Sequence, residues 1–275
     1  MFTGDKIAAK GAEWASRVLF NCDSADDSRL QALLSGDTGV LVLRGLLSEE
    51  ALSSALNSVE EIEDRTRVNS YPNAQLITVG PYLAGCVRSP QVYFDAVKHI
   101  ACDLPPPLVE FNAMIYRIVA AALGLHTLKV ATENADSSYS PFIVLIHRSG
   151  MTMPLHNDMI ARDAKGSGLF IANTKSQLRC VVCLQECTSG GELIHYRKPW
   201  SSSDESLKVN GHFGYPHSVV DGFEKLVFRP MTGDIYIFNP TYYHEVAEIL
   251  GTTRVTMGFF FGHADASTKE MFAWS

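Results

Sequence analysis

The chain has 275 residues, of which 46% are hydrophobic and 19% are charged, a balance that is ordinary for a folded globular protein and excludes wholesale disorder. Lysine and arginine number 23 against 30 aspartates and glutamates, which gives a net charge of −7. This charge argues against nucleic acid as a partner, because phosphate binding requires clustered positive charge.

No segment of the sequence is typical of a membrane span or a secretion signal. The longest apolar stretch, from Ala113 to Leu125, is interrupted by Arg117 and is too short to cross a bilayer. The N-terminus alternates charged and small residues and lacks the apolar core of a signal peptide. We therefore expect a cytoplasmic protein without a membrane partner, whose six cysteines are reduced.

The N-terminal part of the chain is predicted to be mixed in structure. An apolar β segment covers 39–44, and Ser48 caps a following helix whose first turn carries two glutamates. A second helix begins after Ser89, with proline at its first position. A third helix follows the proline run that begins at Pro105, and it ends at Gly124. We expect these helices to pack on the outside of one sheet.

From about residue 139 the pattern changes to short apolar segments separated by turn residues. The predicted strands cover 142–147, 168–172, 178–184, 192–196, 225–228, 234–238 and 255–262. Many short strands without intervening helices indicate a mainly β fold with a double-stranded β-helix core of the jelly-roll, cupin-like type. The polar stretch 201–205 is predicted to be a loop and a candidate mobile flap.

Two cysteines form a C-x-x-C pattern that invites a redox or zinc interpretation. Cys180 and Cys183 lie in the sequence R-C-V-V-C-L, which is typical of a buried strand, and no strand-turn-helix pattern surrounds them. We therefore interpret both as structural residues of a strand.

Three residues form a candidate metal site. His156 and Asp158 are two positions apart, so in an extended strand their side chains point to the same side. His244 follows the predicted strand 234–238, which brings it from the distal part of the core. Two imidazoles and one carboxylate on one side of a metal, with the opposite side open, form the ligand set of non-haem Fe(II) oxygenases. The same three ligand types also suit zinc.

An arginine and a threonine follow the distal histidine. Arg254 lies ten residues after His244 and begins an R-x-T pattern with Thr256. A guanidinium forks onto a carboxylate through two hydrogen bonds, so this pair is a candidate anchor for the distal carboxylate of a dicarboxylic acid. A zinc hydrolase or a non-catalytic cupin-like protein has no need of such an anchor.

The order H-x-D, H and R-x-T resembles that of the Fe(II)/2-oxoglutarate-dependent oxygenases with a double-stranded β-helix core. Several further segments are similar to the free-standing halogenases of indole alkaloids and to the related hydroxylases of N-succinyl amino acids. These segments are Gly80-Pro81-Tyr82-Leu83, Tyr93-Phe94, Ser176-Gln177-Leu178, Gly190–Tyr196, Tyr242-Tyr243-His244 and Trp274-Ser275. The similarity runs from about residue 39 to the end.

The resemblance implies one Fe(II)/2-oxoglutarate oxygenase domain over 1–275, with a mixed part at about 1–138 and the jelly-roll core at about 139–275. It implies Fe(II) bound by His156, Asp158 and His244, with 2-oxoglutarate and dioxygen as cosubstrates. The halogenases of this group carry glycine or alanine where the hydroxylases carry the metal carboxylate. Because Asp158 stands at that position, the resemblance implies hydroxylation of an unactivated C–H bond.

The prime substrate is expected to be a small molecule, either an N-substituted amino acid or a specialised metabolite. Desaturation, cyclisation, epoxidation and epimerisation are alternative outcomes at the same iron site. The candidate substrate-binding residues are Gly80, Tyr82, Met153, Phe170 and Phe259. Arg148 and Arg179 are each expected either to receive an acidic group of the substrate or to pair with a surface carboxylate.

Overall fold

The computed structural model describes residues 14–20, 26–263 and 269–275. Cys22 and the N-terminal segment 1–13, for which the sequence predicts a reduced thiol and no signal core, lie outside the described residues. Within those described ranges, no helix combines the length and the apolar character that a bilayer span requires.

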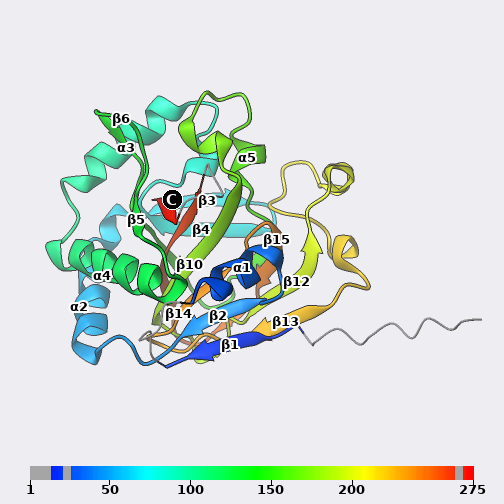
Figure 1. Ribbon diagram of the computed structural model, residues 1–275, viewed down its shortest axis with the longest axis horizontal. Helices are drawn as coiled ribbons and strands as arrows, with labels where there is room; N and C mark the ends of the chain where they lie inside the picture. Colours follow the sequence, from blue (N-terminus) through cyan, green and yellow to red (C-terminus); the bar gives the residue numbers. More distant parts are fainter. Residues whose placement is uncertain (1–13, 21–25, 264–268) are drawn as a thin grey trace, which may run out of the picture.

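A large mixed sheet forms one layer of the structure (Figure 1). Its strands follow the order β1-β2-β14-β10-β17-β8-β4-β3, and β18 joins β5 to β17. The bounds are β1 (Ser16–Leu19), β2 (Val40–Leu43), β3 (Arg67–Tyr71), β4 (Ala74–Val79), β5 (Thr127–Val130), β8 (Ile143–His147), β10 (Ser176–Gln185), β14 (Ile235–Phe238), β17 (Arg254–His263) and β18 (Glu270–Trp274).

A smaller antiparallel sheet of order β13-β12-β15-β9 forms the second layer. Its strands are β9 (Met153–His156), β12 (Leu193–Pro199), β13 (Lys225–Phe228) and β15 (Tyr242–Val246). Two short pairs complete the β structure, namely β6 (Thr132–Asn134) with β7 (Ser137–Ser138) and β11 (Ser189–Gly190) with β16 (Ile249–Leu250).

Helices cover the outer face of the large sheet, with α2, α3 and α4 on the left in Figure 1. The α-helices are α1 (Asp27–Ser35), α2 (Glu49–Glu61), α3 (Pro90–Ala101), α4 (Pro106–Leu123) and α5 (Ile160–Asp163). Short 3-10 helices are η1 (Glu63–Arg65), η2 (Leu83–Gly85), η3 (Phe170–Asn173), η4 (Ser202–Leu207) and η5 (His217–Val220).

The strand period of two residues produces two cores from one sheet. On β17, Met257 and Phe259 belong to the core that the sheet shares with α1, α2 and α4. On the opposite face of the sheet, Val181 and Phe238 pack with Phe228 of the small sheet. The two sheets thus enclose an interior of their own, which is the double-stranded β-helix that the sequence predicts.

The predicted helix signals are confirmed. The Ser48 hydroxyl accepts a hydrogen bond from the Ala51 N–H at 3.2 Å at the start of α2. Gly124 ends α4 with a φ of 66°, a left-handed conformation that glycine adopts without steric cost. Cys180 and Cys183 lie in β10, where burial raises the pKa of both thiols. Residues three apart on a strand face opposite sides, so these two do not form a paired site.

Two predicted segments differ from the structure. Residues 168–172 do not form a strand, because η3 occupies this region. Residues 201–205 are not an open loop, because most of them belong to η4. Asp204 of η4 is buried and accepts hydrogen bonds from Lys198 Nζ at 2.6 Å and from the Tyr243 hydroxyl at 2.9 Å. These bonds anchor the candidate flap to the small sheet.

Candidate metal centre and adjoining pocket

The two histidines of the candidate triad lie directly opposite each other on paired strands. His156 ends β9, and its register partner on β15 is His244. The Nδ1 of His156 lies 2.7 Å from the Pro154 carbonyl oxygen, and that of His244 lies 3.0 Å from the Tyr242 carbonyl oxygen. A carbonyl only accepts, so each Nδ1 carries the proton and each Nε2 presents a lone pair. Both rings are therefore oriented as metal ligands.

Asp158 completes the group immediately after β9. Its N–H donates to the Pro240 carbonyl oxygen at 2.8 Å, which fixes the backbone at this position. Its Oδ2 lies 3.8 Å from Nε2 of His156 and 3.5 Å from Nε2 of His244. This Oδ2 is buried and has no hydrogen-bond partner within the described chain. All three donor atoms lie within 4.8 Å of one another, which is the arrangement required to hold one metal ion.

The charge states of the group suit a divalent cation. Burial, and then the neighbouring His244, lower the pKa of His156 to about 3, so its imidazole is neutral at pH 7. Burial alone raises the pKa of Asp158, but the contact with His244 and the charge of Arg179 help to outweigh burial and hold this pKa below its usual range. Two imidazoles and one carboxylate match non-haem Fe(II) and also zinc.

Aromatic rings pack against both histidines and restrict their rotation. The Phe213 ring lies 5.2 Å from the His156 ring, and the Phe238 ring lies 5.0 Å from the His244 ring, measured between centroids. Phe238 reaches the site from β14 of the large sheet, whereas Phe213 belongs to the segment 208–216 outside the paired strands. The two layers and this outer segment thus meet at the metal ligands.

Arg254 and Thr256 lie in β17 on the face opposite the helical core. Arg254 is buried and donates to the Tyr236 hydroxyl at 2.8 Å, and no described carboxylate lies within ion-pair distance of it. His147 is its register partner on β8, and the Nδ1 of that histidine is buried without a hydrogen-bond partner among the described residues. A buried cation without a counterion is costly, so this interior position is suited to an anion.

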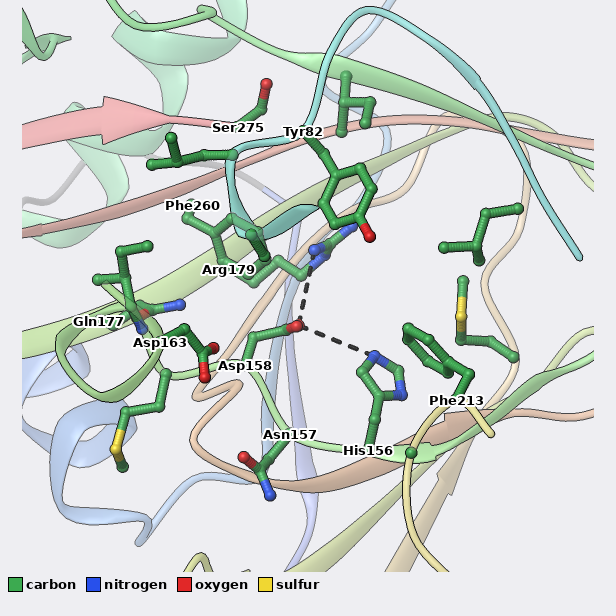
Figure 2. A pocket seen from close by; sticks show the side chains of 18 of the residues that line it. Tyr82, His156, Asn157, Asp158, Asp163, Gln177, Arg179, Phe213, Phe260 and Ser275 are labelled. Atoms are coloured by element: carbon green, nitrogen blue, oxygen red, sulfur yellow. Dashed lines mark hydrogen bonds and ion pairs between the residues drawn. The ribbon is translucent and has the colours of Figure 1, made fainter. Parts of the chain in front are cut away.

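A pocket of about 290 Å³ opens beside the metal ligands, and Figure 2 shows its lining side chains. His156 and Asp158 line it, together with Arg179, Gln177 and Asn157. The apolar part of the wall is formed by Leu76, Leu83, Ile143, Leu145, Met153, Met159, Ile160, Phe213, Phe260 and Trp274. A mainly apolar pocket with a few polar groups is typical of a small-molecule site.

The structure brings some of the predicted substrate-binding residues together and places others elsewhere. Tyr82 and Met153 line the pocket. Phe259 does not, because its side chain lies in the helical core, 4.5 Å from the Tyr116 ring. Phe170 belongs to η3, and its ring packs against the Phe272 ring with 5.2 Å between the ring centroids. Gly80 follows β4 and does not contribute to the lining.

Arg148 and Arg179, each expected to bind either a substrate acid or a surface carboxylate, lie in different environments. Arg148 is exposed and pairs with the exposed Glu63 at 3.4 Å, so it is a surface residue. Arg179 lines the pocket, where its Nη1 lies 3.8 Å from Asp158 Oδ2 and its guanidinium lies 4.5 Å from the centre of the Phe260 ring. Arg254 and Thr256 are buried deeper on the same face of the sheet and are not part of the pocket wall.

Two features of the wall were not predicted from the sequence. Phe213 covers His156, and Asn73 in the turn between β3 and β4 holds it through two hydrogen bonds of 2.9 Å to the Phe213 N–H and carbonyl. Arg162 forms an ion pair with the adjacent Asp163 at 2.7 Å and lies over the Trp200 ring. Asn73 and Phe213 are 140 residues apart, so no local pattern connects them.

Comparison with characterised proteins identifies relatives by sequence. A protein of Purpureocillium lilacinum described as leucinostatins biosynthesis cluster protein S is 30% identical over 165 residues, 58% of this chain and 64% of that protein. An L-isoleucine 3(1)-dioxygenase of Pantoea ananatis (strain AJ13355) is 30% identical over 142 residues, 50% of this chain and 48% of that protein. The alignments thus span about half to two thirds of these relatives.

The fold is shared with a solved N-substituted L-amino acid dioxygenase of Burkholderia ambifaria AMMD, in complex with alpha-KG. The TM-score is 0.59 at 16% identity, with 90% of this chain and 91% of that chain covered. The family model of the carrier-protein-independent halogenase WelO5 matches residues 20–275. By its sequence, this chain therefore belongs to the family of the carrier-protein-independent halogenase WelO5.

Proposed function

We propose that the protein is an Fe(II)/2-oxoglutarate-dependent dioxygenase that hydroxylates an unactivated C–H bond of a small molecule. The observation that carries this proposal is the convergence of three donors, from His156, Asp158 and His244, beside a substrate-sized pocket. The dioxygenase relative supports the same chemistry. The substrate class is an N-substituted amino acid or a specialised metabolite.

The three ligands would hold Fe(II) by one side and leave the remaining positions for cosubstrates. When bound, the metal supplies the activation of dioxygen, in which one oxygen atom enters the substrate C–H bond and the other enters succinate as 2-oxoglutarate loses carbon dioxide. The task of the protein is to fix the two imidazoles through the backbone carbonyls of Pro154 and Tyr242 and to exclude water with the apolar wall.

Arg254 is the proposed partner of the distal carboxylate of 2-oxoglutarate, with Thr256 beside it. Its support is the buried guanidinium without a described counterion, next to the unpartnered Nδ1 of His147. Burial, and then the charges of Arg254 and Arg179, lower the pKa of His147 to about 3, so this ring adds no second cation to the interior.

Asp158 favours hydroxylation over halogenation. A chloride ion requires a free coordination position on the metal, and here a carboxylate points to that position from the same side as both histidines. The three protein ligands, together with the cosubstrates, would therefore leave no place for chloride at the metal. Membership in a family named for a halogenase is therefore compatible with a hydroxylase activity in this chain.

The proposal also covers the domain organisation, the cellular location and the partners of the protein. We infer one catalytic domain over 1–275, since the family model covers residues 20–275 and both N-terminal strands β1 and β2 join the large sheet. We further propose a cytoplasmic enzyme that has a small-molecule substrate and no nucleic-acid or membrane partner, in line with its net charge of −7.

The test is anaerobic loading with Fe(II), followed by addition of 2-oxoglutarate, air and candidate substrates in chloride buffer. We expect succinate to form only with iron, and the product to be heavier than the substrate by one oxygen atom. A product that has lost two hydrogens would instead indicate desaturation or ring closure. No iron-dependent succinate with any substrate, or release of succinate by the His244→Ala variant at the wild-type rate, would contradict the proposal.

A further inference from the structure

The inference concerns Arg179, the pocket cation that the proposed chemistry leaves without a task. Its side chain is 14% exposed, and in Figure 2 the guanidinium points into the pocket toward Asp158. The structure gives it no hydrogen bond to another described residue. Its only described ion pair is with Asp158 Oδ2 at 3.8 Å, which is beyond hydrogen-bond distance. The N–H donors of Arg179 are therefore available to a bound molecule.

The other charged side chains of the pocket wall already have partners. Arg162 forms a two-point pair with Asp163, in which Nε and Nη2 donate at 2.7 and 3.1 Å. Lys208 pairs with Glu205 at 2.9 Å. Asp158 is the carboxylate that faces both histidines, and a bound metal ion takes up its negative charge. Once Asp158 is engaged by a metal ion, Arg179 is the cationic side chain of the wall that has no other counterion among the described residues.

The position of Arg179 makes an unpaired guanidinium electrostatically unfavourable when a metal ion is bound. It extends from β10 onto the Phe260 ring, which fixes the plane of the guanidinium. A divalent ion held by Asp158 would lie close to this second positive group, and the two would repel each other at short range in a largely apolar pocket. An anionic group placed between the guanidinium and the apolar wall removes this repulsion and satisfies the open donors.

We propose that Arg179 binds a carboxylate of the prime substrate, so that the enzyme selects small carboxylic acids with an apolar body. This inference rests on the proposed function, and it narrows the substrate class to anions. The planar fork of Arg179 matches a carboxylate through two parallel hydrogen bonds. The apolar residues Leu76, Leu83 and Ile143 lie in the same wall and are suited to an aliphatic or aromatic body.

The first experiment needs no variant. Wild-type protein with Fe(II) and saturating 2-oxoglutarate is given N-acetyl-L-leucine and N-acetyl-L-phenylalanine, each beside its own primary carboxamide. The paired compounds have nearly equal size and differ by one charge. We expect succinate formation to be stimulated by the acids, with a kcat/KM at least about 30-fold above that of the amides, since a lost charge-assisted contact in a buried site costs roughly 2 kcal/mol or more.

Variants of Arg179 assign the preference to this residue. Arg179→Gln should remove the difference between acid and amide, and Arg179→Lys should restore part of it, because lysine keeps the charge without the fork. Arg148→Gln is the matched control, since Arg148 is exposed and pairs only with Glu63. Anaerobic equilibrium dialysis of labelled N-acetyl-L-leucine reports the same preference as binding, independently of turnover.

The carboxylate that is proposed to bind Arg179 could also come from 2-oxoglutarate itself. If Arg179→Gln raises the 2-oxoglutarate concentration needed for turnover and leaves the preference for acids intact, the assignment to the prime substrate is overturned. Equal use of acids and amides by the wild type, or stimulation by neither series, also overturns it. These failures are distinct from a failure of the proposed function, in which iron-dependent succinate formation itself is missing.

Discussion

The candidate metal ligands and the outer wall of the pocket are built in different ways. His156 and His244 lie on paired strands, and backbone carbonyls hold both rings. The outer wall includes Phe213, which lies outside the paired strands and whose main chain is held by one exposed side chain, Asn73. The main chain therefore fixes the ligand geometry, whereas individual side chains fix the shape of the wall.

This difference separates two kinds of mutational effect. Loss of a candidate ligand removes a donor that no neighbouring residue replaces, so the effect on metal binding should be large. Loss of a wall contact leaves the strand ladder intact and changes only how well the pocket holds a substrate. Wall variants should therefore produce graded changes and keep the metal.

The largest expected effect is that of His244→Ala. This variant should lose bound iron and turnover together, with activity reduced by well over the ~100-fold that is typical of losing a residue that only supports a ligand. Metal analysis of the purified protein and succinate assays measure both. His217→Ala is the control, because His217 contacts Glu245 of the same strand but is largely exposed. Full iron content in His244→Ala would contradict the expected difference between ligand variants and wall variants.

Asp158→Gly should be the next most severe change, because it removes the only charged ligand. We expect iron affinity to fall by at least about 10-fold, while the histidine pair still gives weak binding. The vacated position would accept azide or chloride, which spectroscopic titration of the iron-loaded variant detects. The wild type should give no chlorinated product even at high chloride concentration. A chlorine isotope pattern in the wild-type product would contradict the role assigned to Asp158.

Arg254→Met tests the interior of the barrel, which is also held by paired strands. We expect the KM for 2-oxoglutarate to rise by about 30-fold or more, from the loss of roughly 2–5 kcal/mol of charge-assisted binding. The KM for the prime substrate should change much less. Arg148→Met serves as the control, because it removes an exposed arginine from the segment that connects β8 to β9. An unchanged KM for 2-oxoglutarate in Arg254→Met would exclude Arg254 as the anchor.

Asn73→Ala tests the wall and should have the smallest effect. Two exposed hydrogen bonds to Phe213 are lost, each with a net value of about 0.5–1.5 kcal/mol. We expect the KM for the prime substrate to rise by up to about tenfold, with iron content and the KM for 2-oxoglutarate unchanged. Asn69→Ala, on the same hairpin and exposed, is the control. Loss of iron in Asn73→Ala would show that wall and metal site are not separable.

The candidate metal site could be proposed from the sequence because its signal is chemical and partly local. His156 and Asp158 are two residues apart, and only a few ligand sets combine two imidazoles with one carboxylate. The sequence also predicts the jelly-roll core and the caps at Ser48 and Gly124, where single residues report backbone geometry. The two caps depend on single residue types, whereas the triad and the jelly-roll core depend on the order of segments along the chain.

Phe259 illustrates an error that strand periodicity corrects. Arg254 and Thr256 were predicted to bind one carboxylate together. Because side chains on a strand alternate, residue 260 rather than 259 shares their face. The structure accordingly places Phe260 in the pocket wall and Phe259 in the helical core. The contact of Asn73 with Phe213 was not predictable, because it depends on how two distant loops approach each other.

The most direct test of the account is an anaerobic titration of the purified protein with Fe(II) and then 2-oxoglutarate, followed through the visible charge-transfer absorption of the iron chelate. The account predicts one chelate per chain in the wild type, an unchanged signal in Asn73→Ala and Arg148→Met, and no signal in His156→Ala or His244→Ala. A wild-type protein that forms no chelate, or a His244→Ala variant that forms one with the wild-type affinity, would contradict the assignment of His156, Asp158 and His244 as the iron site.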